Sequence, residues 1–403
     1  MKKNTLSNGA RLLIEKTNTD SVSIVVCVNV GSNNEPKNLL GISHFLEHMI
    51  FEGTKKRANA TIITNEIEQL GGELNAYTTN EMTVFYIKLL GKYFDTALDI
   101  MVDMLQNPIF PKHSLEKERK VILKEINMIT DEPRFYQWIL FMKTLFKTHP
   151  AKNPTYGMIK TVKTISRDDI MNYYKEYYSA NNIIISIAGN FSENNTKKVM
   201  EKFGRLVFKN LLPKAFIEEP KQNKPIIKIE NCNILNSYMV FGYKTPTRET
   251  YESYVLDVIK AILARGQSGK IVERIRNEKG LAYEVNLQHD ANCGFGIFAV
   301  YLNSYKRNIN QIKRIIIEEL NSLRDPKERD IKIAKGFIEG HYKLGNEDTF
   351  RLADKLAFWE HIESAKLHYS YIDTIKGVTR EDIIKVSKKY LDKNFTMALI
   401  AQS

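Results

Sequence analysis

Apolar residues recur along this chain with two different periods, one typical of strands and the other of helices. The β-branched apolar run from Ser21 to Val30 ends at a turn rich in Gly and Asn, and it predicts a buried strand. Shorter runs at 73–79 and 83–90 predict two further strands. Segments with helical spacing lie at 61–71, 92–106 and 114–130. This mixture, without a Gly-rich phosphate loop, favours an α+β fold with mainly antiparallel sheets covered by helices.

The second half of the chain repeats part of the first. Thr374–Ile383 resembles Thr161–Ile170 and follows it at a distance of 213 residues. Each segment opens a helix rich in Tyr and Lys, which leads to an Asn and then to a strand. We infer two homologous half-domains. Their predicted bounds are 1–212 and 226–403, joined by a linker at 213–225 that contains Pro, Lys and Glu.

Composition places the chain among ordinary soluble proteins. Of its 403 residues 43% are hydrophobic and 26% charged, and no apolar run is long enough to span a membrane. The N-terminus has no apolar signal segment, so we expect a cytoplasmic protein. The formal charge of +12 could suit nucleic acid, but the lysines are spread over the whole chain without a recognisable binding module. We therefore expect no nucleic-acid partner; attraction of acidic peptides, or simple solubility, explains the charge equally well.

The stretch 41–54 carries the candidate chemistry. His44, Glu47 and His48 share one face of a predicted helix, because positions i, i+3 and i+4 are neighbours. Two imidazoles one turn apart can bind one Zn²⁺, and a carboxylate beside them can act as a general base. The order His-x-x-Glu-His is the inverted zinc motif. The alternative is a buried helix with hydrogen-bonded core histidines, but three ionisable groups on one buried face need a partner.

Two carboxylates in the helix predicted at 114–130 extend this hypothesis. Glu118 and Glu125 are about two helical turns apart and fall in the apolar stripe of that helix. Contacts with Arg or Lys are the ordinary explanation for such residues. Because a metal short of ligands is already expected, we predict Glu125 as the third zinc ligand and Glu118 as the residue that orients a ligating His.

The second copy is predicted to have no metal site. The offset of 213 residues places Asp257, Lys260 and Ala261 at the positions of His44, Glu47 and His48. These three residues do not form a zinc-binding pattern.

These motifs resemble those of the M16 (pitrilysin) metallopeptidases, the inverzincins, over essentially the whole chain. The resemblance is greatest to the short chains that include the β-subunit of the mitochondrial processing peptidase and its bacterial relatives. It rests on three segments, 41–54, 74–78 and 118–125. It implies a fold of the LuxS/MPP type and a zinc-dependent endopeptidase with one zinc ion per chain. The implied roles are zinc binding by His44, His48 and Glu125, general base catalysis by Glu47, and support by Glu118.

The resemblance also implies how a peptide binds. Asn75, Ala76 and Tyr77 match the edge strand that pairs with the substrate backbone, although an ordinary edge strand is the alternative. Arg276 and Tyr283 match the family's Arg-x₆-Tyr pair. There the Tyr hydroxyl can hydrogen-bond the tetrahedral oxyanion, while the Arg binds substrate carbonyls or orients the Tyr. The sequence alone would suggest a salt-bridging Arg and a packed Tyr.

A chamber of four halves is typical of the family, so a chain with two halves implies a homodimer or a heterodimer with a sister chain. The long Gly-rich loop of the α-type processing-peptidase partner is absent, since only Arg265–Gly269 stands at that position. Unstructured peptides are the expected substrates. The alternatives are a catalytically inactive scaffold subunit of the same fold and an enzyme active only as a heterodimer.

Overall fold

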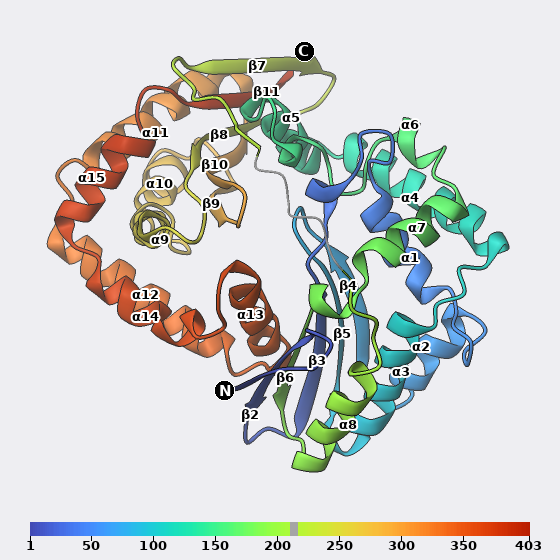
Figure 1. Ribbon diagram of the computed structural model, residues 1–403. Helices are drawn as coiled ribbons and strands as arrows, with labels where there is room; N and C mark the ends of the chain where they lie inside the picture. The colour runs from blue at the N-terminus through green and yellow to red at the C-terminus, as the bar shows by residue number, and fades with distance from the viewer. Residues whose placement is uncertain (210–216) are drawn as a thin grey trace. The chain divides into compact units, whose positions relative to one another are not determined.

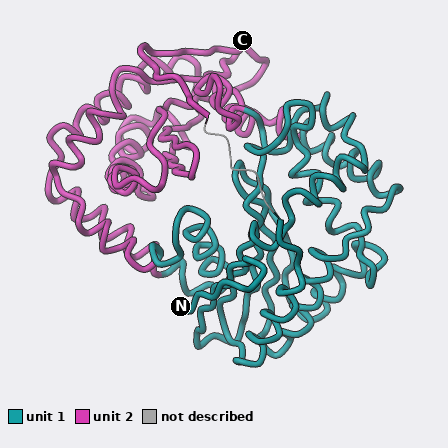
Figure 2. Tube along the Cα trace, viewed as in Figure 1, with its two compact units in different colours: residues 1–127, 153–216, 344–368 teal, residues 128–152, 217–343, 369–403 magenta. Residues whose placement is uncertain are grey.

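A computed structural model describes residues 1–209 and 217–403 (Figure 1). The chain forms two compact units (Figure 2), and neither is a contiguous segment. Unit 1 contains 1–127, 153–216 and 344–368; unit 2 contains 128–152, 217–343 and 369–403. Of the linker predicted at 213–225, residues 213–216 lie outside the described part, and the remainder belongs to unit 2.

Unit 1 is built on a six-stranded sheet with the order β1-β2-β6-β3-β5-β4. The strands are β1 (Lys2–Thr5), β2 (Arg11–Lys16), β3 (Ser21–Val28), β4 (Glu73–Thr78), β5 (Thr83–Leu90) and β6 (Ile183–Gly189). All neighbouring strands are antiparallel except β2 and β6. Residues 22–28 of β3 are all buried, so the buried strand predicted at 21–30 is confirmed.

Alternating residues of β3 pack into two different hydrophobic clusters. Ile24 and Val26 face a cluster that includes Phe45 and the helices of the first half, whereas Val25 faces a cluster that includes Leu352. The second cluster is covered by α13 (Thr349–Ile362), which packs against β3 and β6 (Figure 1). The remaining helices that lie wholly in unit 1 are α1 (Ile42–Phe51), α2 (Ala60–Glu68), α3 (Phe94–Gln106), α6 (Ile159–Val162), α7 (Arg167–Tyr177) and α8 (Glu193–Phe203), and α4 (Lys112–Asp131) begins there.

Unit 2 repeats this topology with five strands in the order β7-β11-β8-β10-β9. They are β7 (Ile226–Cys232), β8 (Ser237–Thr245), β9 (Val285–Ala291), β10 (Gly296–Ser304) and β11 (Thr396–Gln402). Again one pair, β7 and β11, is parallel and the others are antiparallel. The sheet therefore matches β2-β6-β3-β5-β4 strand for strand, and the predicted fold class, two mainly antiparallel sheets flanked by helices, is confirmed.

Helix α5 (Pro133–Leu145) comes from the first half of the sequence but packs in unit 2. Its Leu140 and Phe141 join a buried cluster with Val240 of β8 and Ala398 of β11. Besides α13, the helices of the second half are α9 (Tyr251–Leu263), α10 (Lys270–Val272), α11 (Ile309–Ser322), α12 (Glu328–Gly345), α14 (Leu367–Gly377) and α15 (Arg380–Tyr390). Short helical turns are η1 (Ser32–Asn34), η2 (Gly91–Tyr93), η3 (Pro150–Lys152), η4 (Ala180–Asn182), the π-helical η5 (Glu273–Glu278) and η6 (Lys306–Asn308). Among the described residues, no helix combines the length and apolar composition that a bilayer crossing requires.

Candidate metal centre

Helix α1 presents the predicted motif from a buried position. It begins after Gly41, whose φ of 97° lies in the left-handed region. A Cβ at Gly41 would stand 2.7 Å from the Tyr156 carbonyl oxygen, so the close approach also requires glycine. Packing of its apolar residues buries most of the helix and leaves the two imidazoles side by side, with ring centroids 4.6 Å apart for His44 and His48.

The three predicted ligands lie together. Glu125 Oε2 is 3.9 Å from His44 Nε2 and 3.6 Å from His48 Nε2, and one donor atom from each residue lies within 4.8 Å of the others. Tetrahedral zinc with bonds of about 2.1 Å needs donor atoms about 3.4 Å apart. No Arg or Lys within the described ranges pairs with Glu125, which removes the ordinary explanation for that carboxylate. Both the donor set and its spacing therefore fit zinc.

Glu118 lies behind His48. Its Oε2 is 3.0 Å from His48 Nδ1, and its other oxygen is 3.2 Å from Lys117 Nζ. This contact engages Nδ1 and leaves Nε2 facing Glu125. The hydrogen bond with His48 lowers the pKa of Glu118. Burial opposes a raised pKa at His48, but the hydrogen bond with Glu118 and the nearby carboxylates outweigh it, and the pKa of His48 is raised.

His44 has a different environment. Burial, with a smaller contribution from His48, lowers the pKa of His44 to about 3. The ring is therefore neutral at pH 7, which is the form that binds metal. Its Nδ1 atom is buried and has no hydrogen-bond partner in the described part of the chain. His44 thus lacks the outer contact that orients His48.

Glu47, the predicted general base, is 8% exposed and accepts a hydrogen bond from the Thr78 hydroxyl. Burial raises the pKa of Glu47. The sequence analysis assigned no role to Thr78. Its position two residues after Ala76 was the available signal, because residues i and i+2 of a strand face the same side of the sheet.

Strand β4 carries Asn75, Ala76 and Tyr77 and is the last strand of its sheet, paired only with β5 among the described strands. The Tyr77 hydroxyl donates to Asp354 of α13, and the Asn75 side chain accepts from the Ala76 N–H. Ala76 packs against the cluster that contains α1. The edge strand therefore lies beside the helix that carries Glu47.

Arg276 and Tyr283 belong to unit 2 and contact each other. The Arg276 guanidinium lies 5.3 Å from the centre of the Tyr283 ring and donates to Gln267 Oε1 at 2.6 Å. Tyr283 is 82% exposed, so it is not a packed tyrosine. Among the described residues, Arg276 donates to the Gln267 amide oxygen and forms no ion pair with a carboxylate, so the salt-bridge alternative is also not observed.

The position equivalent to the metal centre in unit 2 is filled differently. Asp257 on α9 lies 2.7 Å from Arg248 Nη1 and 2.7 Å from His289 Nδ1. The Tyr371 hydroxyl donates to the same carboxylate at 2.9 Å.

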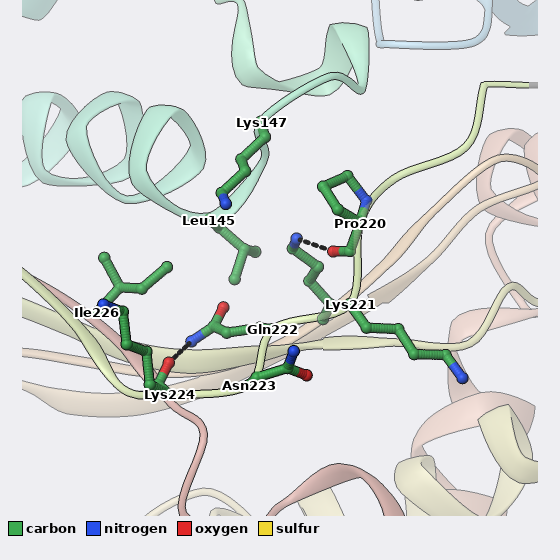
Figure 3. Close-up of a pocket in the computed structure, with 9 residues that line it drawn as sticks. Leu145, Lys147, Pro220, Lys221, Gln222, Asn223, Lys224 and Ile226 are labelled. Atoms are coloured by element: carbon green, nitrogen blue, oxygen red, sulfur yellow. Dashed lines mark hydrogen bonds between the residues drawn. The ribbon is translucent and has the colours of Figure 1, made fainter.

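A separate cavity of about 270 Å³ lies within unit 2 (Figure 3), and none of the predicted site residues lines it. Its wall includes four lysines, and its shape is held by hydrogen bonds from Gln222 to Lys224 O and from Lys244 to Pro220 O.

Two family models match the chain. The first, described as insulinase (peptidase family M16), matches residues 11–158. The second, described as the peptidase M16 inactive domain, matches residues 164–336. The chain belongs to peptidase family M16. The division into one matched domain with the metal motif and one called inactive agrees with the contrast between the His44 and Asp257 positions.

Curated M16 relatives are similar over their whole length. YmxG of Bacillus subtilis, named as an uncharacterized zinc protease, is 28% identical over 412 residues, covering 100% of this chain and 98% of that protein. An uncharacterized zinc protease of Rickettsia felis is 27% identical, covering 98% of this chain and 96% of that protein. These names place zinc and proteolysis at the level of the M16 family.

Solved structures support the M16 fold. A protease from Helicobacter pylori superposes with a TM-score of 0.93 at 20% identity, covering 99% of each chain. A peptidase M16 inactive domain from Pseudomonas fluorescens gives 0.90 at 18% identity, covering 100% of this chain and 98% of the other. A chain of complex III from Candida albicans gives 0.82 at 15% identity, covering 99% of this chain and 95% of the other.

Proposed function

We propose that this M16 chain is a zinc-dependent endopeptidase that hydrolyses unstructured peptides. The observation that carries the proposal is the convergence of donor atoms from His44, His48 and Glu125 within 4.8 Å, with Glu47 on the intervening turn of α1. The three ligands would hold the ion, and Glu118 would keep His48 in the tautomer that binds it. When bound, zinc would supply Lewis acidity, which polarises a carbonyl and lowers the pKa of water to about 7.

Glu47 is the proposed general base. It takes a proton from the attacking water and later passes that proton to the leaving amine. Its raised pKa makes the carboxylate a stronger proton acceptor than an exposed glutamate. The Thr78 hydroxyl holds the carboxylate by a hydrogen bond and so limits the directions in which it can accept.

Strand β4 is the proposed platform for substrate. Its open edge offers backbone groups to an extended peptide, and main-chain pairing tolerates many sequences. An extended strand must lie along this edge, so unstructured peptides are preferred over folded proteins. Tyr283 would donate a hydrogen bond to the tetrahedral oxyanion, and Arg276, stacked on its ring, would keep the Tyr283 side chain in place.

We also propose that two chains enclose the substrate in a chamber of four homologous halves. The support is the resemblance to chamber-forming M16 enzymes, together with the two matching sheets in one chain. Both a homodimer and a heterodimer with a sister chain satisfy this count. Peptidase assays on the isolated chain, with its mass measured in solution, distinguish the two.

The second candidate is a catalytically inactive scaffold subunit. The fold shared with a complex III chain of Candida albicans favours it. Against it, this chain retains every residue of the predicted metal centre, and their donor atoms face one another.

Cleavage of a mixed peptide pool, with and without chelator and read by mass spectrometry, tests the proposal. We expect chelator-sensitive endoproteolytic cleavage that returns when zinc is added. A purified, folded wild-type protein that carries no stoichiometric zinc and leaves every peptide intact would favour the scaffold.

A further inference from the structure

Glu35 lies between η1 and α1, six residues before the helix begins to turn at Gly41. Its carboxylate accepts two backbone hydrogen bonds from the start of α1. The Gly41 N–H lies 2.7 Å from Oε2, and the Ser43 N–H lies 2.9 Å from Oε1. Burial raises the pKa of Glu35 to about 7, although these hydrogen bonds act in the opposite direction. The carboxyl group is therefore held in an environment that disfavours its charge.

Helix α1 has no N-cap side chain of its own that could accept these hydrogen bonds. The first N–H groups of a helix have no partner within the helix and are usually satisfied by a side chain at the N-cap. Here the N-cap is Gly41, which has no side chain. Glu35 replaces the missing cap from outside the helix, at the end where the helix dipole favours a negative charge.

Other contacts hold the same turn from different directions. The Thr161 hydroxyl donates to the Leu40 carbonyl oxygen at 2.6 Å. The Ser43 hydroxyl lies 2.9 Å from the Tyr173 hydroxyl on α7. Glu35 is the group among these that holds two amides of the turn at once.

The two histidines of the metal centre depend on their surroundings in different ways. His48 is oriented through its ring by Glu118, at 3.0 Å. His44 has no such contact in the described residues, since its buried Nδ1 has no partner. The direction of its ring must therefore come from packing and from the backbone of the first turn, where His44 directly follows Ser43.

We propose that Glu35 is a positioning residue of the metal centre, which holds the Gly41 and Ser43 amides and thereby fixes His44 for zinc binding. The inference rests on the proposed function, because it concerns the same zinc ion.

The test compares zinc affinity of the full chain before and after Glu35→Gln. Glutamine keeps the shape, but its NH₂ group cannot accept the second backbone N–H. We expect the zinc dissociation constant, measured by competition with a chelator on metal-free protein, to rise about 10- to 100-fold, as for other outer-shell partners. We also expect an altered absorption spectrum after Co²⁺ replaces zinc. The matched control is Glu201→Gln, because Glu201 is exposed and pairs only with Arg205 among the described residues.

A merely structural role gives a different result. In that case Glu35→Gln lowers the melting temperature of the metal-free protein, but leaves the zinc dissociation constant and the Co²⁺ spectrum unchanged, which overturns the proposal. Failure of the proposed function is recognised separately, since wild-type protein would then bind no stoichiometric zinc.

Hydrogen exchange on the wild type decides the matter if Glu35→Gln does not fold. We expect peptides covering 36–45 to be protected in metal-free protein to the same degree as in zinc-loaded protein, because Glu35 has already formed the turn. Fast exchange in this segment that becomes slow only with zinc would overturn the proposal.

Discussion

Helices α1 and α9 stand beside sheets of the same strand order, yet they satisfy their buried polar groups in different ways. In unit 2, Asp257 is surrounded by Arg248, His289 and the Tyr371 hydroxyl, so its charge is neutralised within the protein. In unit 1, the donor atoms of His44, His48 and Glu125 face one another with no Arg or Lys among the described residues that approach Glu125. Buried charges need partners, and Asp257 finds its partners within the protein. The partly buried donor atoms of unit 1 are instead spaced as ligands of a metal ion would be.

The second helix of each site shows the same contrast. Glu118 and Glu125 of α4 correspond, at the offset of 213 residues, to Ile331 and Ile338 of α12. Ile331 is buried, so an apolar side chain stands where Glu118 contacts His48 in unit 1. Under the proposed function, a few side chains decide whether this position of the fold binds metal, since the surrounding strands have the same order and direction in both units.

The largest expected effect comes from Glu47→Gln. Loss of the general base should reduce kcat about 10²- to 10⁴-fold while zinc content stays unchanged. The matched control is Lys260→Gln at the equivalent position of the second copy, which should leave turnover unchanged. Near wild-type turnover of Glu47→Gln would exclude Glu47 as the base. Peptide cleavage rates and metal analysis of the same preparations provide the measurement.

Asp257→Asn tests the internal ion pair of unit 2. It removes the carboxylate charge that pairs with Arg248, which is 8% exposed, and should lower the free energy of unfolding by about 3 kcal/mol. Zinc content should not change. His44→Asn is the matched variant in unit 1, and it should do the reverse, with loss of zinc and little effect on the metal-free protein. Denaturant unfolding of both metal-free variants distinguishes these outcomes; equal destabilisation would remove the contrast.

Tyr283→Phe asks whether the second copy contributes to catalysis although it has no predicted metal site. Loss of an oxyanion donor should reduce kcat about 10²-fold with little change in KM. Tyr305→Phe is a suitable control, because Tyr305 is also exposed and also lies under an arginine, Arg307. A Tyr283→Phe enzyme as active as the control would exclude this role.

Glu118→Gln should weaken zinc binding about 10-fold or more, because His48 loses the carboxylate that orients it. Chelator competition measures the change. Glu116→Gln on the exposed side of the same helix serves as the control. Unchanged affinity in Glu118→Gln would show that packing alone orients His48.

The smallest expected effect is the loss of stability of unit 2 at acidic pH. Glu219 accepts the backbone N–H groups of Lys147, Thr148 and His149 and pairs with Lys244. Burial opposes ionisation, but these contacts lower the pKa of Glu219 to about 2. Because the native pKa is below the unfolded one, its contribution, on the order of 2 kcal/mol, is present above about pH 4.5 and declines as the pH falls toward 2.

The measurement is the difference in unfolding free energy between wild type and Glu219→Gln at pH 6 and pH 3.5. We expect the difference to narrow at the lower pH. Glu218→Gln, at the neighbouring exposed position, should show no such trend. A difference that is constant with pH would contradict the assigned contacts.

Local periodicity was enough to predict much of the site. The i, i+3, i+4 spacing brought His44, Glu47 and His48 to one helix face, and the spacing of Glu118 and Glu125 in an apolar stripe added the second helix. Contacts from outside the helix could not be predicted in this way. Thr78 reaches Glu47 only because β4 lies beside α1, and Glu35 reaches Gly41 through an irregular turn.

The sequence also could not predict where helices α5 and α13 pack. An amphipathic pattern says which side of α5 or α13 is apolar, but not which sheet that side covers. Both helices pack in the unit built mainly from the other half of the sequence. For the same reason the partners of Asp257 could not be predicted, because His289 reaches Asp257 only through the packing of β9 against α9.

Metal analysis of the purified full chain tests the central claim most directly. The account predicts close to one zinc ion per wild-type chain and almost none in Glu125→Ala, while Ile338→Ala, at the equivalent position of the second copy, retains the metal. Wild-type protein that is folded, exposed to zinc and still free of bound metal would contradict it.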